Sequence, residues 1–185
     1  MTKPNLTKLS KFLALVLRHK AANFSLELDG DGYADVEAMW ALIENRFGDA
    51  YLMDDLLTVV EGDRQGKKRY EMVDGKIRAL FGHSRVAPIA YPPVEPPEHL
   101  FHGTAAEAVA PILQTGLEAR SRQYVHLTSD YGMARTVARR HSQDIVILII
   151  QALAAHRAGV IFHNPAANIY LAQTIPARFI AAKEG

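Results

Sequence analysis

The stretch Leu9-Ser-Lys-Phe-Leu-Ala-Leu-Val-Leu-Arg-His-Lys20 decides the fold of the first half of the chain. Its apolar residues recur at intervals of three and four, which places five of them on one face of a helix: Leu9, Phe12, Leu13, Val16 and Leu17. This face predicts a platform packed on a core. Arg18 and His19 follow at its far end, where cations also complement the negative end of a helix dipole. The stretch alone therefore does not distinguish a site from a helix end.

The composition predicts a globular chain with room for two small domains. Of its 185 residues, 49% are hydrophobic and 22% are charged. The 21 Lys and Arg residues against 20 Asp and Glu leave a net charge of +1, so a nucleic-acid partner would have to bind local basic patches. Seven Lys or Arg residues between positions 64 and 85 and five Arg residues between 120 and 140 form such patches, although each also suits a solvated surface.

The residues that are missing exclude several classes of protein. Because the chain has no cysteine, it forms no disulfide, no thiolate nucleophile and no zinc site built on sulfur. The longest apolar run, residues 145–150, is far too short to span a membrane. We expect a soluble, cytoplasmic protein without a membrane partner.

The first ninety residues predict three helices and a hairpin. We expect a strand at 25–28, a turn at 29–32, a helix capped by Asp35 and another that begins near Asp54 and ends at Gly62. Residues 67–73 and 76–80 read as strands joined by Asp74-Gly75, a pair that favours a type I′ turn. Three helices followed by a basic hairpin are typical of a winged helix. If Tyr70 is buried, its neighbour Arg69 points to solvent or a ligand.

A proline-rich stretch separates the two halves. Five of the nine prolines lie between positions 88 and 97, and such a segment favours a semi-rigid extended connector. We place the domain boundary there, between residues 1–90 and 91–185. In the second half we expect strands at 99–104, 122–130, 145–150, 159–162 and 169–171, and helices at 105–113 and up to Arg139-Arg-His141. This mixture predicts an α+β domain.

An ordered set of short motifs runs over nearly the whole chain: Ser10-Lys-Phe-Leu13, Leu17-Arg-His19, Leu28-Asp29, Gly32-Tyr33, Lys68-Arg69-Tyr70, Ile77-Arg-Ala79, Gly82-His-Ser84, Leu100-Phe-His-Gly-Thr104, Gly116-Leu117, Arg122, Tyr124-Val-His-Leu127 and Arg140-His141. Together these motifs resemble one family, the NAD-dependent RNA 2′-phosphotransferases of the tRNA-splicing type. Any single motif is weak, whereas the ordered set is highly specific.

The resemblance implies an enzyme with two lobes, and we expect it to be a monomer. Residues 1–90 would form a winged-helix lobe that binds RNA, and residues 91–185 a lobe similar to ADP-ribosyltransferases that binds NAD+. Enzymes of this family transfer an internal RNA 2′-phosphate to NAD+ through an ADP-ribosylated RNA. The products are RNA with a free 2′-hydroxyl, nicotinamide and ADP-ribose 1″,2″-cyclic phosphate.

The resemblance also implies the residues of the site. Arg18, His19, Arg69 and Arg122 match the family's catalytic positions, and planar guanidinium groups suit a phosphate with close to two negative charges. Six residues match positions expected to bind NAD+ as co-substrate: His102, Gly103, Thr104, Thr128, Asp130 and Arg140. The scheme requires no metal, in agreement with the lack of a His-Glu-x-x-His motif. The sequence also lacks the Gly-x-Gly-x-x-Gly fingerprint of a Rossmann site.

Three positions depart from the family's pattern, and two other functions stay open. Phe81 stands in place of Gln, Ala167-Asn168 in place of Asn-Gly, and Asp144 in place of Pro. An ADP-ribosyltransferase that caps 5′-phosphate ends of nucleic acids would use the same NAD+ residues and stop after the first step. A non-catalytic winged-helix protein that binds nucleic acid would explain the first half but not His102-Gly-Thr104 together with Arg122.

Overall fold

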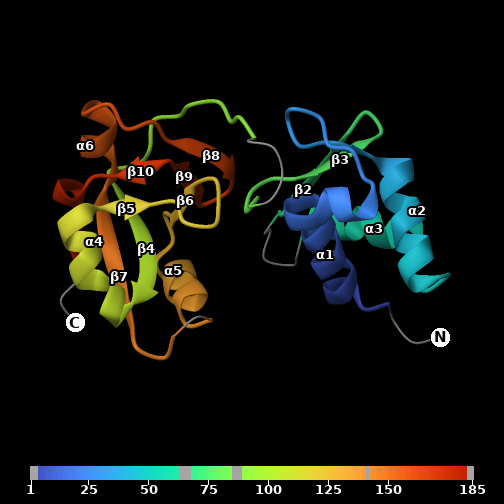
Figure 1. The fold of residues 1–185 in the computed structure, drawn as a ribbon, viewed down its shortest axis with the longest axis horizontal. Coiled ribbons are helices and arrows are strands. Elements are labelled where there is room, and N and C mark those ends of the chain that lie inside the picture. Colours follow the sequence, from blue (N-terminus) through green and yellow to red (C-terminus); the bar gives the residue numbers. More distant parts are fainter. Residues whose placement is uncertain (1–3, 63–67, 85–88, 141, 183–185) are drawn as a thin grey trace. The chain divides into compact units, whose positions relative to one another are not determined.

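The computed structural model of the chain describes residues 4–62, 68–84, 89–140 and 142–182. The chain divides into two compact units, Met1–Ala90 and Tyr91–Gly185 (Figure 1). Both contain helices and antiparallel sheets, so the predicted α+β class is confirmed at this level. Within the described ranges, no helix is both long and apolar enough to cross a membrane.

The opening stretch forms a helix that changes its winding. Helix α1 (Leu6–Leu15) is capped by Asn5, whose side chain accepts a hydrogen bond from the backbone N–H of Lys8. A π-helical turn (Val16–Lys20) and a 3₁₀ turn (Ala21–Phe24) continue it. The predicted apolar face is confirmed, since its members are at most 7% exposed: Leu9, Phe12, Leu13, Val16 and Leu17.

Two further helices complete this side of the first core. The side chain of Asp35 accepts a hydrogen bond from the N–H of Ala38 and caps α2 (Val36–Phe47), as predicted. Helix α3 (Met53–Glu61) begins slightly earlier than expected, because the Asp55 carboxylate accepts a hydrogen bond from the N–H of Leu52. It ends at Gly62.

The strand predicted at 25–28 is wrong. Ser25 has a left-handed φ of 52°, and the N–H of Leu26 donates to the carbonyl of Ala21, so this segment closes the helical turns. The third strand is instead β1 (Ala34–Asp35), which pairs with β3 (Lys76–Ala79). Local composition could not show this, because the pairing partners lie more than forty positions away along the chain.

The predicted hairpin is confirmed over its described part, residues 68–80. Strands β2 (Tyr70–Val73) and β3 pair through Val73 and Lys76, and the sheet has the order β1-β3-β2. Asp74 and Gly75, with φ of 49° and 74°, form the turn with two positive φ angles that the sequence predicted. Tyr70 is fully buried. Lys67, the expected first residue of the hairpin, lies outside the described ranges.

The second unit is built on a six-stranded antiparallel sheet. Its order is β11-β7-β4-β6-β9-β8, formed by Ile180–Ala182, Ile145–Gln151, His99–Ala105, Val125–Thr128, Ile169–Ala172 and His163–Ala166. A small second sheet pairs β5 (Leu117–Glu118) with β10 (Thr174–Ile175). Three helices accompany these strands: α4 (Val109–Thr115), α5 (Tyr131–Ala138) and α6 (Ala152–Arg157).

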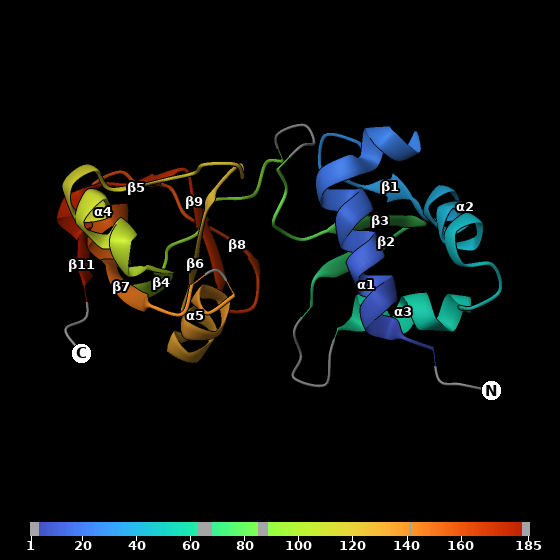
Figure 2. The same cartoon turned by 60° about the horizontal axis from the view of Figure 1, so that its bottom comes forward.

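The two faces of the large sheet have separate cores. Leu100, Leu148 and Ile150 belong to the main core, which Ile112 of α4 also joins. On the other face, Ala134 and Ala138 of α5 pack with Ile147. Figure 2 shows α4 and α5 on different sides of strands β4 and β7. A residue's place in β4 therefore decides which helix it meets.

Two expectations for this unit need correction. The strand predicted at 159–162 lies at His163–Ala166, because only Phe162 of the predicted segment pairs, in an isolated bridge with Val94. Val94 belongs to the proline-rich stretch, and its N–H donates to the Phe162 carbonyl over 2.8 Å. This stretch is thus bound to the second unit rather than being only a connector. Helix α6 was not predicted from the sequence.

Candidate active site

The first group of predicted catalytic residues lies in the π-helical turn after α1. Arg18 and His19 are both half-buried there, and π-turns within helices occur frequently at functional sites. The segment after β3 contacts both residues. The backbone N–H of Ser84 donates to the Arg18 carbonyl over 3.1 Å, and Ser84 Oγ lies 2.8 Å from His19 Nδ1. Residues far apart in sequence thus fix the turn.

Two aromatic rings lie close to the Arg18 guanidinium. Its central carbon is 5.0 Å from the ring centre of Phe81 and 5.7 Å from that of Tyr70, within the range of cation–π attraction. The Nε and Nη2 atoms of Arg18 are buried. Arg69 precedes Tyr70 and is itself half-buried, and its carbonyl accepts a hydrogen bond from the N–H of Leu80 over 3.0 Å. The first unit thus holds three of the four predicted catalytic residues.

His83 is a buried neighbour of this group that the sequence did not single out as a site residue. It is 3% exposed, and burial lowers its pKa from 6.5 to about 4, helped by electrostatic repulsion from Arg18, His19 and Arg78. His83 is therefore neutral near pH 7. Its place in the Gly-His-Ser motif was the available signal, but its burial near Arg18 and His19 depends on the tertiary fold.

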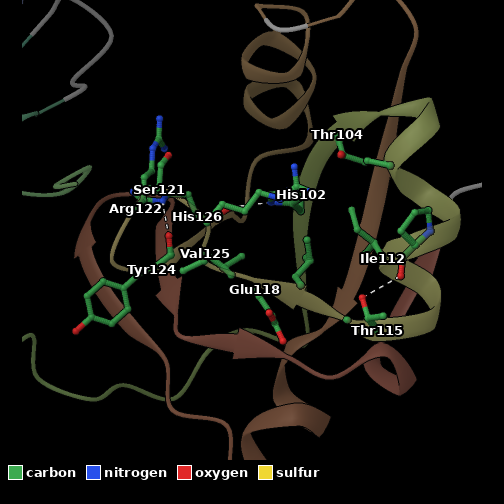
Figure 3. A pocket seen from close by; sticks show the side chains of 16 residues that line it. His102, Thr104, Ile112, Thr115, Glu118, Ser121, Arg122, Tyr124, Val125 and His126 are labelled. Carbon is green, nitrogen blue, oxygen red and sulfur yellow. Dashed lines mark hydrogen bonds between the residues drawn. The ribbon is translucent and has the colours of Figure 1, made fainter. Parts of the chain in front are cut away.

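The second unit contains a cavity of about 420 Å³ between α4, β4 and the segment that leads into β6 (Figure 3). Three of the predicted site residues line it: His102, Thr104 and Arg122. In Figure 3, Arg122 lies to one side of His102 and Thr104 to the other. Thr115, Glu118 and Arg120 also line the cavity and were not identified from the sequence. Their positions depend on the packing of α4 and β5, which no local motif indicates.

Alternation along β4 separates the residues of the His102-Gly103-Thr104 triplet. His102 and Thr104 line the cavity, whereas Gly103 faces α5 on the other side of the sheet. A Cβ atom at Gly103 would lie 2.5 Å from the carbonyl oxygen of Ala134 and 2.7 Å from Cβ of Ala138. The structure therefore gives Gly103 a packing role, and its contact with a cofactor stays a prediction.

The His102 ring has a defined orientation and charge. Its Nδ1 atom lies 3.0 Å from the backbone carbonyl of His126, which can only accept, so Nδ1 carries a proton and donates. Burial lowers the pKa of His102, and Arg122 lowers it further, whereas the hydrogen bond to His126 opposes the shift. The neutral ring then has an unprotonated Nε2 atom, which can accept a hydrogen bond from a ligand.

The other predicted cofactor residues surround the ends of α5. The Asp130 carboxylate caps this helix by accepting the N–H of Met133 over 2.9 Å, and Thr128 Oγ1 accepts the N–H of Asp130 over 3.1 Å. Thr128 is buried, and Arg140 lies exposed beyond the end of the helix. None of these three residues lines the cavity described above. The sequence predicted that this helix ends at Arg139-Arg-His141, and His141 lies outside the described residues.

The three departures from the family's pattern have identifiable surroundings. Asn168 takes a φ of 60° in the turn between β8 and β9, a conformation that asparagine tolerates almost as glycine does. Its side-chain oxygen accepts a hydrogen bond from Ser129 Oγ over 2.9 Å. The carbonyl of Asp144 accepts the N–H of Ala106. Phe81 contacts Arg18, as described above. Within the described ranges, no three His, Asp or Glu side chains are grouped to hold a metal ion.

Comparison with known proteins identifies the family. The profile of the RNA 2′-phosphotransferase, Tpt1/KptA family matches residues 4–174. A probable RNA 2′-phosphotransferase of Acetivibrio thermocellus is 39% identical over 175 residues, which cover 94% of this chain and 95% of the relative. A probable RNA 2′-phosphotransferase of Pseudomonas aeruginosa is 39% identical over 183 residues, which cover 97% of this chain and 98% of the relative. A third, of Pectobacterium carotovorum, is 40% identical over 174 residues, which cover 92% of this chain and 91% of the relative. The chain belongs to the Tpt1/KptA family of RNA 2′-phosphotransferases.

Proposed function

We propose that this enzyme transfers an internal RNA 2′-phosphate to NAD+, releasing nicotinamide and ADP-ribose 1″,2″-cyclic phosphate. The observation that carries the proposal is the cavity of the second unit, in a chain of this family, with His102, Thr104 and Arg122 in its wall. We assign residues 91–185 to the NAD+-binding, ADP-ribosyltransferase-like lobe. Residues 1–90, with three helices and a hairpin, are assigned to a winged-helix RNA lobe.

The cavity suits part of a dinucleotide. Its volume of about 420 Å³ lies within the ~300–1,000 Å³ of ordinary ligand sites. Arg120 and Arg122 supply positive charge for phosphate groups, and Thr104 supplies a hydroxyl. His102 adds an acceptor at Nε2 without adding a positive charge, because its pKa is lowered. This matters because the nicotinamide ring of NAD+ is itself cationic.

In the first step, an oxygen of the RNA 2′-phosphate forms a bond to C1″ of the nicotinamide ribose as the bond from C1″ to nicotinamide breaks. The nucleophile is already an anion, so no base is needed. The residues of the chain instead orient it. Arg18, Arg69 and Arg122 are assigned to this task, because guanidinium groups can bind phosphate oxygens in pairs.

In the second step, the 2″-hydroxyl attacks phosphorus, the bond from phosphorus to the RNA 2′-oxygen breaks, and this oxygen takes up a proton. The arginines stabilise the negative charge that grows on the phosphate oxygens. We assign His19 to the proton transfer or to the transferring phosphate. Its contact with Ser84 at Nδ1 fixes the orientation of the ring.

The test is to incubate the enzyme with an oligoribonucleotide carrying one internal 2′-phosphate, with and without NAD+. Chromatography should show that the RNA loses its 2′-phosphate only when NAD+ is present. ADP-ribose 1″,2″-cyclic phosphate should appear among the nucleotide products at the same time. An oligonucleotide with only a 5′-phosphate is the matched control, and a stable ADP-ribose cap on it would indicate the capping activity instead. Dephosphorylation of the 2′-phosphate without NAD+ would overturn the proposed co-substrate. A tRNA-splicing substrate and a cytoplasmic location are part of the same proposal.

A further inference from the structure

The surroundings of Arg18 contain a side chain whose role the proposed chemistry does not yet explain. Phe81 follows β3 directly and is half-buried, so it is not part of the first unit's fully buried core. Its ring centre lies 5.0 Å from the guanidinium carbon of Arg18, closer than the 5.7 Å to Tyr70. An aromatic ring held at this distance from a cation attracts it electrostatically.

Other residues of the first unit also surround Arg18. Tyr70 is fully buried, and its hydroxyl donates to the backbone carbonyl of Ser10 in α1, so its ring has a set position. Gly82 follows Phe81, and a Cβ atom there would lie 3.3 Å from Arg18 Nη1. The N–H of Ser84 donates to the Arg18 carbonyl. The segment from Phe81 to Ser84 thus follows the length of Arg18 from side chain to backbone.

We propose that Phe81 is a positioning residue that holds the Arg18 guanidinium in one orientation before the RNA phosphate binds. This inference rests on the proposed role of Arg18. A free arginine side chain has several rotatable bonds, and binding phosphate in a fixed fork requires that this freedom be lost. Attraction by the Phe81 ring removes part of that freedom in advance.

If Phe81 acts through the electron density on the face of its ring, kcat should depend on that density and not only on the volume of the side chain. Phe81→Leu keeps an apolar side chain but removes the ring, and we expect kcat for the 2′-phosphorylated oligonucleotide to fall about tenfold. The KM for NAD+ should stay unchanged. Phe81→Tyr and Phe81→Trp should restore most of kcat. Replacing Phe81 by phenylalanines carrying one, two or three fluorine atoms should lower log kcat stepwise, since fluorine withdraws electron density from the ring face. Equal kcat across the fluorinated series would overturn the proposal.

A second measurement tests the proposal without requiring activity. In enzyme with ¹⁵N-labelled arginine, the Nε–H resonance of Arg18, identified by its loss in Arg18→Lys, should move in Phe81→Leu as the ring current disappears. Phe47→Leu is the control, because Phe47 is another ring of the first unit and pairs with Lys8 at 5.2 Å. An Arg18 resonance that stays in place in Phe81→Leu would show that the ring does not hold the side chain. If the wild type lacks 2′-phosphotransferase activity while this shift occurs, the proposed function fails and the positioning contact stands.

Discussion

The Nδ1 atom of His19 lies 2.8 Å from Oγ of Ser84, a contact between residues 65 positions apart in the chain. A histidine that exchanges a proton needs one ring nitrogen held and the other directed at the substrate. We expect Ser84→Ala to lower kcat about fivefold through loss of one hydrogen bond. Stopped-flow turnover checks this, with Thr58→Val as control, since the Thr58 hydroxyl donates to the Asp54 carbonyl within α3. Unchanged kcat in Ser84→Ala would remove Ser84 from the orientation of His19.

The two chemical steps should respond differently to changes at His19 and Arg69. The second step demands extra charge stabilisation and a proton transfer, so we expect His19→Ala and Arg69→Ala to slow it more than the first step. ADP-ribosylated RNA should then accumulate before it is slowly resolved. A rapid-quench time course with labelled 2′-phosphate RNA measures this. Slow loss of substrate with no accumulated intermediate would contradict the selective role.

Arg122 should matter for activity and hardly at all for stability. Its side chain is exposed at the cavity of the second unit, and exposed cations contribute only about 0–1 kcal/mol to stability. We expect Arg122→Ala to reduce turnover by orders of magnitude with little change in Tm. The matched control is Arg139→Ala, an exposed arginine after α5. Normal turnover in Arg122→Ala would exclude this arginine from the phosphate site.

Gly103 should prove essential for packing. A methyl group at this position would meet the Ala134 carbonyl at 2.5 Å, so α5 would have to move away from the sheet. We expect Gly103→Ala to lower the free energy of unfolding of the second unit by about 1–3 kcal/mol. Urea denaturation measures the change. Gly30→Ala is the control, because a Cβ atom there meets nothing within 4 Å. Wild-type stability in Gly103→Ala would refute the packing role.

His83 should make the first unit sensitive to acid. Its pKa is about 4 in the folded chain against a usual 6.5, so the unfolded chain binds more protons between these values. Stability is therefore full above about pH 6.5 and falls as the pH drops toward 4. The loss between pH 7 and pH 5 should be about 2 kcal/mol. His83→Gln should flatten this dependence in urea titrations, while exposed His99→Gln should retain it. A retained slope in His83→Gln would assign it to other groups.

The sequence by itself determined the elements whose signals are local. The spacing of Leu9 to Leu17, the cap at Asp35 and the Asp74-Gly75 turn each depend on neighbouring residues, and the structure has all three. The ordered motifs were sufficient to indicate the family, which the relatives confirm. The strand expected at 25–28 failed because pairing with a distant strand, not local propensity, decides where β1 forms.

Only the tertiary structure decided what surrounds each site residue. Adjacent residues of β4 face opposite sides of a sheet, so His102 lines the cavity while Gly103 packs under α5. Three features of the site depend on residues more than sixty positions apart in the chain. His83 is buried near Arg18, the Phe81 ring lies beside the Arg18 guanidinium, and the Ser84 hydroxyl lies beside His19. Burial and charge are properties of a folded neighbourhood, and a motif records which residue is present without recording what it contacts.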